Sequence, residues 1–165
     1  MKKHLIYILS GIAMMLIIIL IIVINDFKII RIDGHSMNPT LYEGNFVLSS
    51  NYKELEHGDI IMFYHGDQKF IKRIIGLPGD VVELTQDCKV YINGDRVAEN
   101  YIECYPHAFK NEQYYPLTVP EGEYFILGDN RNDSLDSRII SIGTIEEDRI
   151  IGQIDMSIYP FKSLK

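Results

Sequence analysis

Residues 69–80 read KFIKRIIGLPGD, an apolar run that holds two adjacent cations and ends in a Pro-Gly-Asp turn. Its length and branched side chains are typical of a β-strand, and strand alternation would place Phe70, Lys72 and Ile74 on one face. Ile71 and Arg73 would lie on the other face. A lysine between two large apolar residues faces the side that is otherwise expected to be core. An edge-strand lysine that extends its ammonium group to water is the alternative, and this segment alone does not decide between them.

Short apolar runs separated by turn residues continue on both sides of this segment. The predicted strands comprise residues 29–33, 46–48, 60–64, 70–75, 81–84, 90–92, 96–98, 123–127 and 149–159. The Asn93-Gly94 pair is typical of a tight hairpin, because it tolerates positive φ at both central positions. Residues 99–118 are polar, rich in tyrosine and not assigned. We predict a mostly β fold in which residues 26–165 form one compact, β-barrel-like domain with a variable excursion around 85–120.

Residues 5–24 read LIYILSGIAMMLIIILIIVI and contain no charged side chain. Twenty helical residues span roughly 30 Å, the thickness of the hydrocarbon core of a bilayer. We therefore predict that residues 1–25 form a short N-terminus and one transmembrane anchor helix. A cleaved secretory signal would end in a small-x-small site, whereas Asn25, Asp26 and Phe27 follow here. A buried core helix would show a polar face at helical spacing, which this run lacks.

The distribution of charge predicts the orientation of this anchor. The chain has 16 basic and 23 acidic residues, a formal charge of −7. Lys2 and Lys3 precede the apolar run, and every acidic residue follows it. Because basic residues favour the cytoplasmic side, we expect a single-pass protein of the cell membrane with a cytoplasmic N-terminus and an extracytoplasmic domain. The excess of acids argues against nucleic acid as a partner, since phosphate binding needs clustered cations.

Histidine and cysteine give no metal signature. The histidines lack paired ligand spacing and lie at positions 4, 35, 57, 65 and 107. We therefore expect neither a metal ion nor another cofactor. Cys88 and Cys104 are sixteen positions apart, and an extracytoplasmic location would permit a disulfide. Spacing cannot show whether their α-carbons approach closely enough, so a bridge and two free thiols both remain open.

Residues 34–41 read GHSMNPTL and directly follow a predicted strand. Ser36 lies between a glycine and a proline turn, which would hold its hydroxyl on a fixed loop. A plain turn serine is the alternative. A serine nucleophile needs a base, and Lys72 is the candidate, because burial lowers the pKa of a lysine from about 10.4. The neutral amine could then accept the serine proton near neutral pH.

Residues 128–138 read GDNRNDSLDSR and follow another apolar predicted strand. A solvated loop can have this composition. Opposite charges could instead lock the loop, with Asp129 and Asp136 set against Arg131 and Arg138. A serine hydroxyl in this loop could also hold the lysine amine in place.

In this order the three segments resemble the boxes of the bacterial type I signal peptidases. Those boxes are Ser-Met-x-Pro-Thr-Leu, Lys-Arg-x-x-Gly-Leu-Pro-Gly-Asp and Gly-Asp-Asn-x-x-x-Ser-x-Asp-Ser-Arg, and all three are present here. Residues 57–61, HGDII, resemble the family's Arg-Gly-Asp box with histidine in place of arginine. The resemblance extends from the apolar run to about Phe161. One box alone would be weak, whereas three in order behind an N-terminal anchor are highly specific.

The resemblance implies a β-rich catalytic domain and a serine endopeptidase that uses a Ser-Lys dyad. Ser36 matches the nucleophile and Lys72 the general base. Ser134 matches the serine that hydrogen-bonds the lysine amine, while Asp136 and Arg138 match the family's structural acid and base. Asp129 belongs to the same supporting loop.

The implied reaction is the removal of N-terminal signal peptides from exported preproteins, through an acyl-enzyme and after small residues at positions −3 and −1. The implied partners are preproteins, which add as a strand beside the catalytic groove, the lipid bilayer and the secretion translocon. Specificity for small residues requires shallow apolar pockets. The candidates that flank the two catalytic segments are Ile32, Met37, Leu41, Phe70 and Ile71. Core packing is their alternative role.

Three features depart from the family pattern. Gly34 stands where many members have a serine that donates to the oxyanion, so we expect the Ser36 amide and a further backbone donor or a water to act instead. Asn132 and Asp133 reverse the usual order before the loop serine. His57 replaces a cation whose role the sequence does not reveal.

Other classes of protein fit the sequence less well. A Ser-His hydrolase is the first competitor, but His35 is adjacent to Ser36, and His57 and His65 lie in loop-like sequence. Self-cleaving repressors share the Ser-Lys dyad, yet they are soluble and carry a DNA-binding segment. A non-catalytic partner is expected to lack the serine or the lysine. Among enzymes, a dedicated processor of pilins or a few surface proteins remains open.

Overall fold

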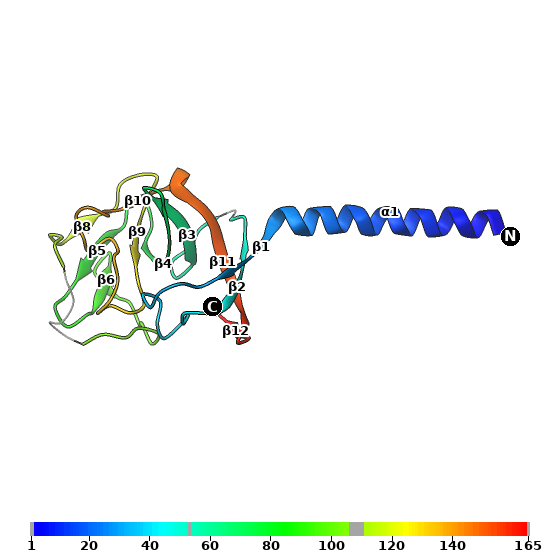
Figure 1. Ribbon diagram of the computed structural model, residues 1–165. Coiled ribbons are helices and arrows are strands. Elements are labelled where there is room, and N and C mark those ends of the chain that lie inside the picture. The colour runs from blue at the N-terminus through cyan, green and yellow to red at the C-terminus, as the bar shows by residue number, and fades with distance from the viewer. Residues whose placement is uncertain (1, 53, 106–110, 165) are drawn as a thin grey trace.

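The structure is a computed structural model that describes residues 2–52, 54–105 and 111–164. Helix α1 (Lys2–Asp26) leads directly into the first strand and projects away from a β-rich body (Figure 1). Large apolar side chains between Tyr7 and Ile18 are exposed on it. Among the described residues, no helix reaches the combination of length and apolar character needed to cross a bilayer.

Two antiparallel sheets form the body. In spatial order, the larger contains β1 (Phe27–Arg31), β2 (Phe46–Ser50), β11 (Ile150–Tyr159), β3 (Ile60–His65), β4 (Gln68–Gly76), β9 (Glu123–Leu127) and β10 (Ile145–Glu146), with β12 (Lys162–Ser163) beside β11. The smaller sheet contains β7 (Asp95–Arg96), β6 (Val90–Ile92), β5 (Val81–Leu84) and β8 (Leu117–Thr118). A short 3₁₀ helix, η1 (Glu147–Arg149), joins β10 to β11.

The period-two pattern located most of these strands. The structure begins and ends β5, β6 and β9 at the predicted residues and lengthens β4 at both ends. Asn93 and Gly94 form the turn between β6 and β7, with φ angles of 54° and 87°. The pattern missed β8, β10 and β12, because each has only two residues and so cannot show alternation.

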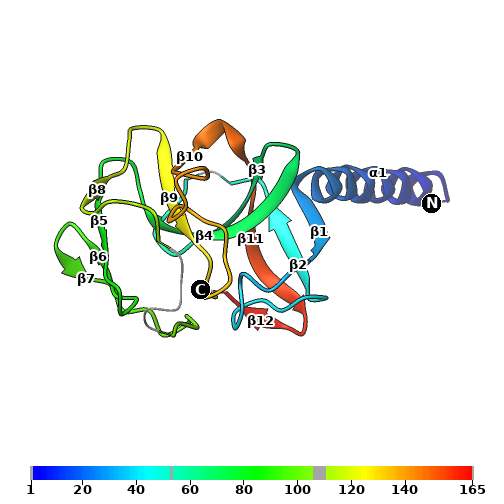
Figure 2. The ribbon, with the colours of Figure 1, turned by 60° about the vertical axis from the view of Figure 1, so that its left-hand side comes forward.

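The predicted β-barrel-like closure is wrong. The larger sheet keeps β1 and β10 as separate edges, and no ladder of hydrogen bonds joins them within the described residues (Figure 2). A barrel requires continuous pairing around the whole sheet. Here β10 has only two residues, and β-bulges interrupt the pairing of β11 with both β2 and β3. Because bulges bend and twist a strand, the sheet curls without closing.

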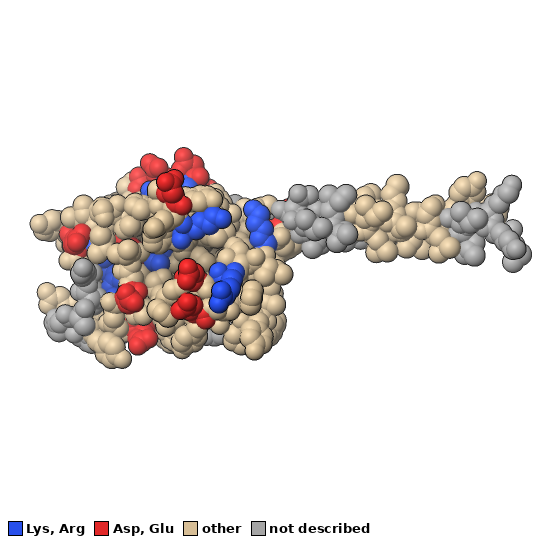
Figure 3. Space-filling view, in the orientation of Figure 1, with Lys and Arg blue, Asp and Glu red and all other residues tan. Residues whose placement is uncertain are grey.

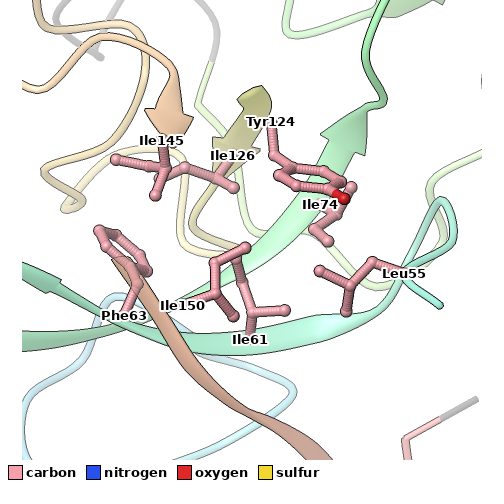
Figure 4. Close-up of a cluster of buried hydrophobic side chains, with 8 residues drawn as sticks. All are labelled: Leu55, Ile61, Phe63, Ile74, Tyr124, Ile126, Ile145 and Ile150. Atoms are coloured by element: carbon pink, nitrogen blue, oxygen red, sulfur yellow. The ribbon is translucent and has the colours of Figure 1, made fainter. Parts of the chain in front are cut away.

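Apolar clusters hold the body together. One lies among β3, β4, β9, β10 and β11 and consists of Leu55, Ile61, Phe63, Ile74, Tyr124, Ile126, Ile145 and Ile150 (Figure 4). A second joins the two sheets and consists of Ile75, Val82, Leu84, Val90, Val119, Phe125 and Leu127. The backbones approach closely at Gly76, where an added Cβ would lie 2.7 Å from the Val82 side chain. Each large side chain buried there contributes about 1.5–3 kcal/mol of transfer free energy.

The excursion predicted around 85–120 contributes β6, β7 and β8, and its residues 106–110 lie outside the described residues. Cys88 and Cys104 form a disulfide with their α-carbons 6.5 Å apart, which resolves the alternatives that spacing left open. Glu103, directly before Cys104, forms an isolated parallel β-bridge with Asn130. The excursion therefore returns to the 128–138 loop, where the candidate site lies.

Candidate active site

The segment that carries Ser36, residues 34–41, is a tight turn between β1 and β2, here called the nucleophile loop. Gly34 has a φ of 87°, a left-handed conformation that glycine adopts without strain. Within the loop, the Asn38 amide donates to the His35 carbonyl at 3.1 Å, and the Leu41 amide donates to that of Met37 at 2.8 Å. The Met37 and Leu41 side chains are buried in a third apolar cluster beneath the loop. Ser36 is thus presented on a folded turn that its buried side chains anchor to the core.

Strand β4 brings Lys72 to this serine. In the β3–β4 ladder Lys72 lies opposite Ile61, and its side chain is almost completely buried, with a relative exposure of 2%. The Lys72 Nζ lies 2.8 Å from Ser36 Oγ and donates a second hydrogen bond, of 3.0 Å, to its neighbour's carbonyl at Ile71. The structure therefore brings the predicted nucleophile and the predicted base within direct hydrogen-bond contact.

The surroundings of Lys72 favour its neutral form. Burial lowers the pKa of Lys72 from its ordinary 10.5 to about 8. The negative charges of Asp136 and Asp129 oppose this shift, while the positive charge of Arg138 adds to it. A substantial fraction of the amine is consequently unprotonated in mildly alkaline solution and able to accept a proton.

A groove of about 680 Å³ opens onto the Ser36 hydroxyl and the Lys72 amine. Its walls come from the end of β1 with the nucleophile loop, from β4, and from the 128–138 loop. Four of the predicted pocket residues line it: Ile32, Met37, Phe70 and Ile71. Leu41 does not, because it is completely buried in the cluster beneath the loop, so a pocket role for Leu41 is wrong.

Ser134 is close to the dyad without the hydrogen bond that the resemblance implies. Its Oγ is buried and meets no hydrogen-bond partner among the described residues. The atom packs instead against Gly128, where an added Cβ would clash with Ser134 Oγ and lie 2.5 Å from the Ser36 carbonyl oxygen. Gly128 therefore allows the nucleophile loop and the 128–138 loop to touch.

Asp129 forms an ion pair that the sequence did not predict. Its carboxylate accepts two hydrogen bonds from the Arg73 guanidinium, at 2.6 and 2.9 Å, rather than pairing with an arginine of its own loop. The Thr40 hydroxyl, at the end of the nucleophile loop, donates to the same carboxylate. Both charged side chains are buried. This cluster therefore ties the nucleophile loop, β4 and the 128–138 loop together.

Three more charged residues of this loop form ion pairs. Asp136 accepts hydrogen bonds from Arg138 at 2.7 and 2.8 Å, as the sequence allowed, and from the Gly128 amide at 2.9 Å. Arg131 pairs instead with Glu99, which lies in the excursion. Both pairs are almost fully buried, so the loop is held as a rigid unit rather than solvated.

Comparison with known proteins identifies the family of the chain. The model of the family described as signal peptidase, peptidase S26, matches residues 5–159. Signal peptidase I T of Bacillus subtilis is 36% identical, over 99% of this chain and 91% of the relative. Signal peptidase IB of Staphylococcus aureus strain Mu50 is 34% identical, over 100% and 95%.

The chain belongs to the signal peptidase family, peptidase S26. It is accordingly a serine endopeptidase of the signal peptidase I type. A crystal structure of a signal peptidase I from Enterococcus faecalis V583 is similar in fold, with a TM-score of 0.51 and 36% identity, over 61% of this chain and 96% of that one.

In this signal peptidase three histidines have side-chain partners other than the nucleophile. No histidine side chain hydrogen-bonds Ser36 among the residues the structure describes. Their partners are Glu43 for His35, Asp80 for His57 and Arg149 for His65. This arrangement gives no support to the competing Ser-His class.

His57, which departs from the family's Arg-Gly-Asp box, contacts the Pro-Gly-Asp turn that follows β4. Its Nε2 lies 2.6 Å from Asp80 Oδ2. The Asp80 carboxylate also accepts the Leu77 amide on Oδ2 and the Asn93 side-chain amide on Oδ1, both at 2.8 Å. Burial opposes ionisation, but these bonds outweigh it and lower the pKa of Asp80. Histidine at this position therefore links two boxes of the family.

Sequence reasoning missed several residues that support the dyad. Thr40, Arg73 and Glu99 were not singled out, because their partners lie 89, 56 and 32 positions away. Their only signal was the presence of polar and charged residues within or near otherwise apolar segments. Asn130 was quoted only as part of a motif, although it contacts the nucleophile loop directly.

Proposed function

We propose that this signal peptidase removes N-terminal signal peptides from exported preproteins with Ser36 as nucleophile and Lys72 as general base. The observation that carries the proposal is the 2.8 Å contact between Ser36 Oγ and a buried Lys72 amine whose pKa is lowered to about 8. A lysine can act as a base near neutral pH only when its ammonium form is destabilised in this way.

The reaction begins when neutral Lys72 accepts the hydroxyl proton of Ser36. Ser36 Oγ forms a bond to the scissile carbonyl carbon, and the carbonyl π electrons move to oxygen as an oxyanion. Collapse of this intermediate breaks the carbon–nitrogen bond, and the Lys72 ammonium returns its proton to the leaving amine. Neutral Lys72 then activates a water that hydrolyses the acyl-enzyme. The Ile71 carbonyl keeps the amine in place throughout.

The oxyanion requires preorganised hydrogen-bond donors. The Ser36 backbone amide is the first candidate, because it belongs to the nucleophile itself, which lines the groove. Gly34 has no side chain to contribute a second donor. A backbone amide or a water therefore completes the site.

The groove accounts for cleavage after small residues at positions −3 and −1. Ile32 and Met37 are nearly buried, with relative exposures of 5% and 3%, so they form a shallow floor rather than a deep pocket. Phe70 and Ile71 add apolar walls from β4. An extended peptide in this groove would place alternate side chains against these surfaces, as strand addition requires.

The N-terminal helix holds the enzyme at the membrane, where the translocon delivers preproteins. Residues 5–24 carry no charge, and the tan stretch in the middle of the helix shows no acidic or basic side chain in Figure 3. The exposed apolar side chains of α1 have no protein surface to cover them, and a bilayer would do so (Figure 1). Lys2 and Lys3 before the apolar run support a cytoplasmic N-terminus.

The test is cleavage of a preprotein with an Ala-x-Ala site by the full chain in detergent or lipid. Ser36→Ala and Lys72→Ala should abolish cleavage while the proteins stay folded. Lys89→Ala is the matched control, because the Lys89 side chain is partly exposed and lies between β5 and β6, away from the groove. If wild type cuts no generic site but processes a pilin, the general role gives way to a dedicated one. If Ser36→Ala retains full activity, the dyad is wrong.

A further inference from the structure

Asn130 joins the 128–138 loop to the nucleophile loop and also hydrogen-bonds within its own loop. Its backbone amide donates to the Ser36 carbonyl at 3.0 Å. Its side-chain Nδ2 donates to the His35 carbonyl at 3.2 Å, and its Oδ1 accepts the Asp133 amide at 3.2 Å. The side chain is also largely buried, with a relative exposure of 9%. Because Oδ1 faces an amide and Nδ2 faces a carbonyl, the orientation of this side-chain amide is fixed by its partners.

The hydrogen bond to the His35 carbonyl also determines the orientation of the Ser36 backbone N–H, the first candidate donor to the oxyanion. The His35 carbonyl and the Ser36 amide belong to the same peptide unit, which is planar, so in a trans peptide the N–H points away from the C=O. Fixing the His35 carbonyl therefore fixes the direction of the Ser36 N–H. Among the described residues this N–H meets no acceptor, so it is free to bind a developing oxyanion.

We propose that Asn130 is a positioning residue that aims the Ser36 backbone amide at the oxyanion. The proposal rests on the function proposed above and extends it to a residue that touches neither substrate nor the Lys72 amine. Holding both carbonyls, of His35 and of Ser36, orients the peptide units on either side of the nucleophile's α-carbon. The hydrogen bond to the His35 carbonyl also polarises that peptide, which makes the Ser36 N–H a stronger donor.

The loop that carries Asn130 is itself braced from its other side. The Glu103 amide donates to the Asp129 carbonyl at 2.8 Å, and the Arg131 amide donates to the Glu103 carbonyl at 2.8 Å. These two bonds flank Asn130 along the chain. The disulfide at Cys104 fixes the bracing segment to the smaller sheet. Asn130 is therefore a rigid contact, as precise positioning of the nucleophile loop requires.

Asn130→Asp is the informative substitution, and Asn132→Asp is its matched control. A carboxylate can accept the Asp133 amide but cannot donate to the His35 carbonyl, so Asn130→Asp removes the proposed contact, places two acceptors against each other and keeps the bond to Asp133. Asn132 accepts the Tyr105 amide at 2.8 Å and donates to the Glu103 carbonyl at 3.4 Å, without touching the nucleophile loop. Asn132→Asp thus makes the same chemical change, with the same added charge, two positions away. Asn130→Ala removes the side-chain donor without adding charge.

Each variant of the full chain is compared at the plateau of its pH profile, which removes any effect of the added charge on Lys72. We expect Asn130→Asp and Asn130→Ala to lower kcat by roughly 10²-fold with KM within about threefold of wild type. Asn132→Asp should keep a wild-type kcat. Thermal unfolding shows whether each variant is folded.

A peptide aldehyde ending in Ala-x-Ala supplies the second measurement. Ser36 Oγ adds to the aldehyde carbon, the π electrons become an oxyanion and the serine proton passes to Lys72, so the adduct needs the same donor as the transition state. The Asn130 variants should bind this aldehyde more weakly by about the factor lost in kcat, and bind an uncleavable peptide as wild type does. The role of Asn130 is overturned if its variants keep the wild-type kcat. It is also overturned if they lose kcat but bind the aldehyde as tightly as wild type, or if Asn132→Asp loses as much kcat as they do. A wild type that cuts no preprotein would overturn the proposed function as well.

Discussion

Lys72 and Arg73 are adjacent cations on opposite sides of strand β4, and their surroundings shift their pKa values in opposite directions. On one side, Lys72 is buried beside a hydroxyl and a carbonyl, and no carboxylate of the described residues lies within hydrogen-bond distance of its amine. On the other, Arg73 is also buried but donates two hydrogen bonds to the Asp129 carboxylate and one, of 2.7 Å, to the Gly58 carbonyl. Burial lowers the pKa of Lys72 to about 8, whereas the bonds and charge of Asp129 outweigh burial and raise the pKa of Arg73.

This difference separates chemistry from support within one strand. A buried charge with a full set of partners stays ionised and fixes the elements that it joins. A buried amine without a carboxylate partner gives up its proton more readily, which a general base requires. The same comparison extends to the 128–138 loop, where Arg131 and Arg138 are both paired and none of the described loop charges acts on the serine hydroxyl directly.

The largest expected effect comes from making Lys72 resemble its neighbour. Lys72→Arg keeps a cation in the same place, but a guanidinium is protonated at every accessible pH and cannot serve as a base. We expect cleavage of an Ala-x-Ala preprotein to fall by about 10³-fold or more. Lys89→Arg, an exposed change of the same kind, should have no effect. An active Lys72→Arg enzyme would show that the amine is not the base.

The next largest effect tests the contact between the two loops. In Gly128→Ala the new methyl group would meet Ser134 Oγ and lie 2.5 Å from the Ser36 carbonyl oxygen, so the serine must move relative to Lys72. We expect kcat to fall by about 10²-fold, since catalysis is sensitive to displacements of about 1 Å. Gly11→Ala is the control, because an added Cβ there meets nothing within 4 Å. Wild-type turnover by Gly128→Ala would show that this contact does not position the nucleophile.

The smallest effect on chemistry should come from a charge of the supporting kind. Glu99→Gln leaves the buried Arg131 without its carboxylate, which should lower the free energy of unfolding by roughly 3–5 kcal/mol in a urea titration. At temperatures where the variant is folded, kcat should stay close to wild type. Asp87→Asn, in an exposed pair, should change neither quantity. A lower kcat in fully folded Glu99→Gln would contradict the separation of catalytic from supporting buried charges.

The sequence predicted the parts of this site that depend on local pattern. Strand alternation located β4, and the ordered motifs pointed to Ser36 and Lys72 and to the loop after β9. The motifs could not show which charges pair, because the partners of Asp129 and Arg131 come from other elements and are chosen by packing. The sequence also could not predict that the large sheet curls without closing, since bulges in β11 and the two-residue β10 leave no periodic signal.

The role of Asn130 illustrates the same limit. Its residue type and motif position were visible, but its two contacts with the nucleophile loop depend on how segments 95 positions apart come together. Leu41 shows the reverse error, because proximity in sequence to Ser36 suggested a pocket, while the turn points its side chain into the core.

The central claim is that a buried, neutral Lys72 is the general base, and the pH dependence of kcat/KM tests it most directly. The active form is the unprotonated amine, so activity should rise with pH and level off above an apparent pKa near 8. The measurement uses the full chain in detergent with a soluble peptide that contains an Ala-x-Ala site. A rise centred near pH 8 is the predicted result. Activity that appears only near pH 10, or that does not change between pH 6 and 10, would contradict the account.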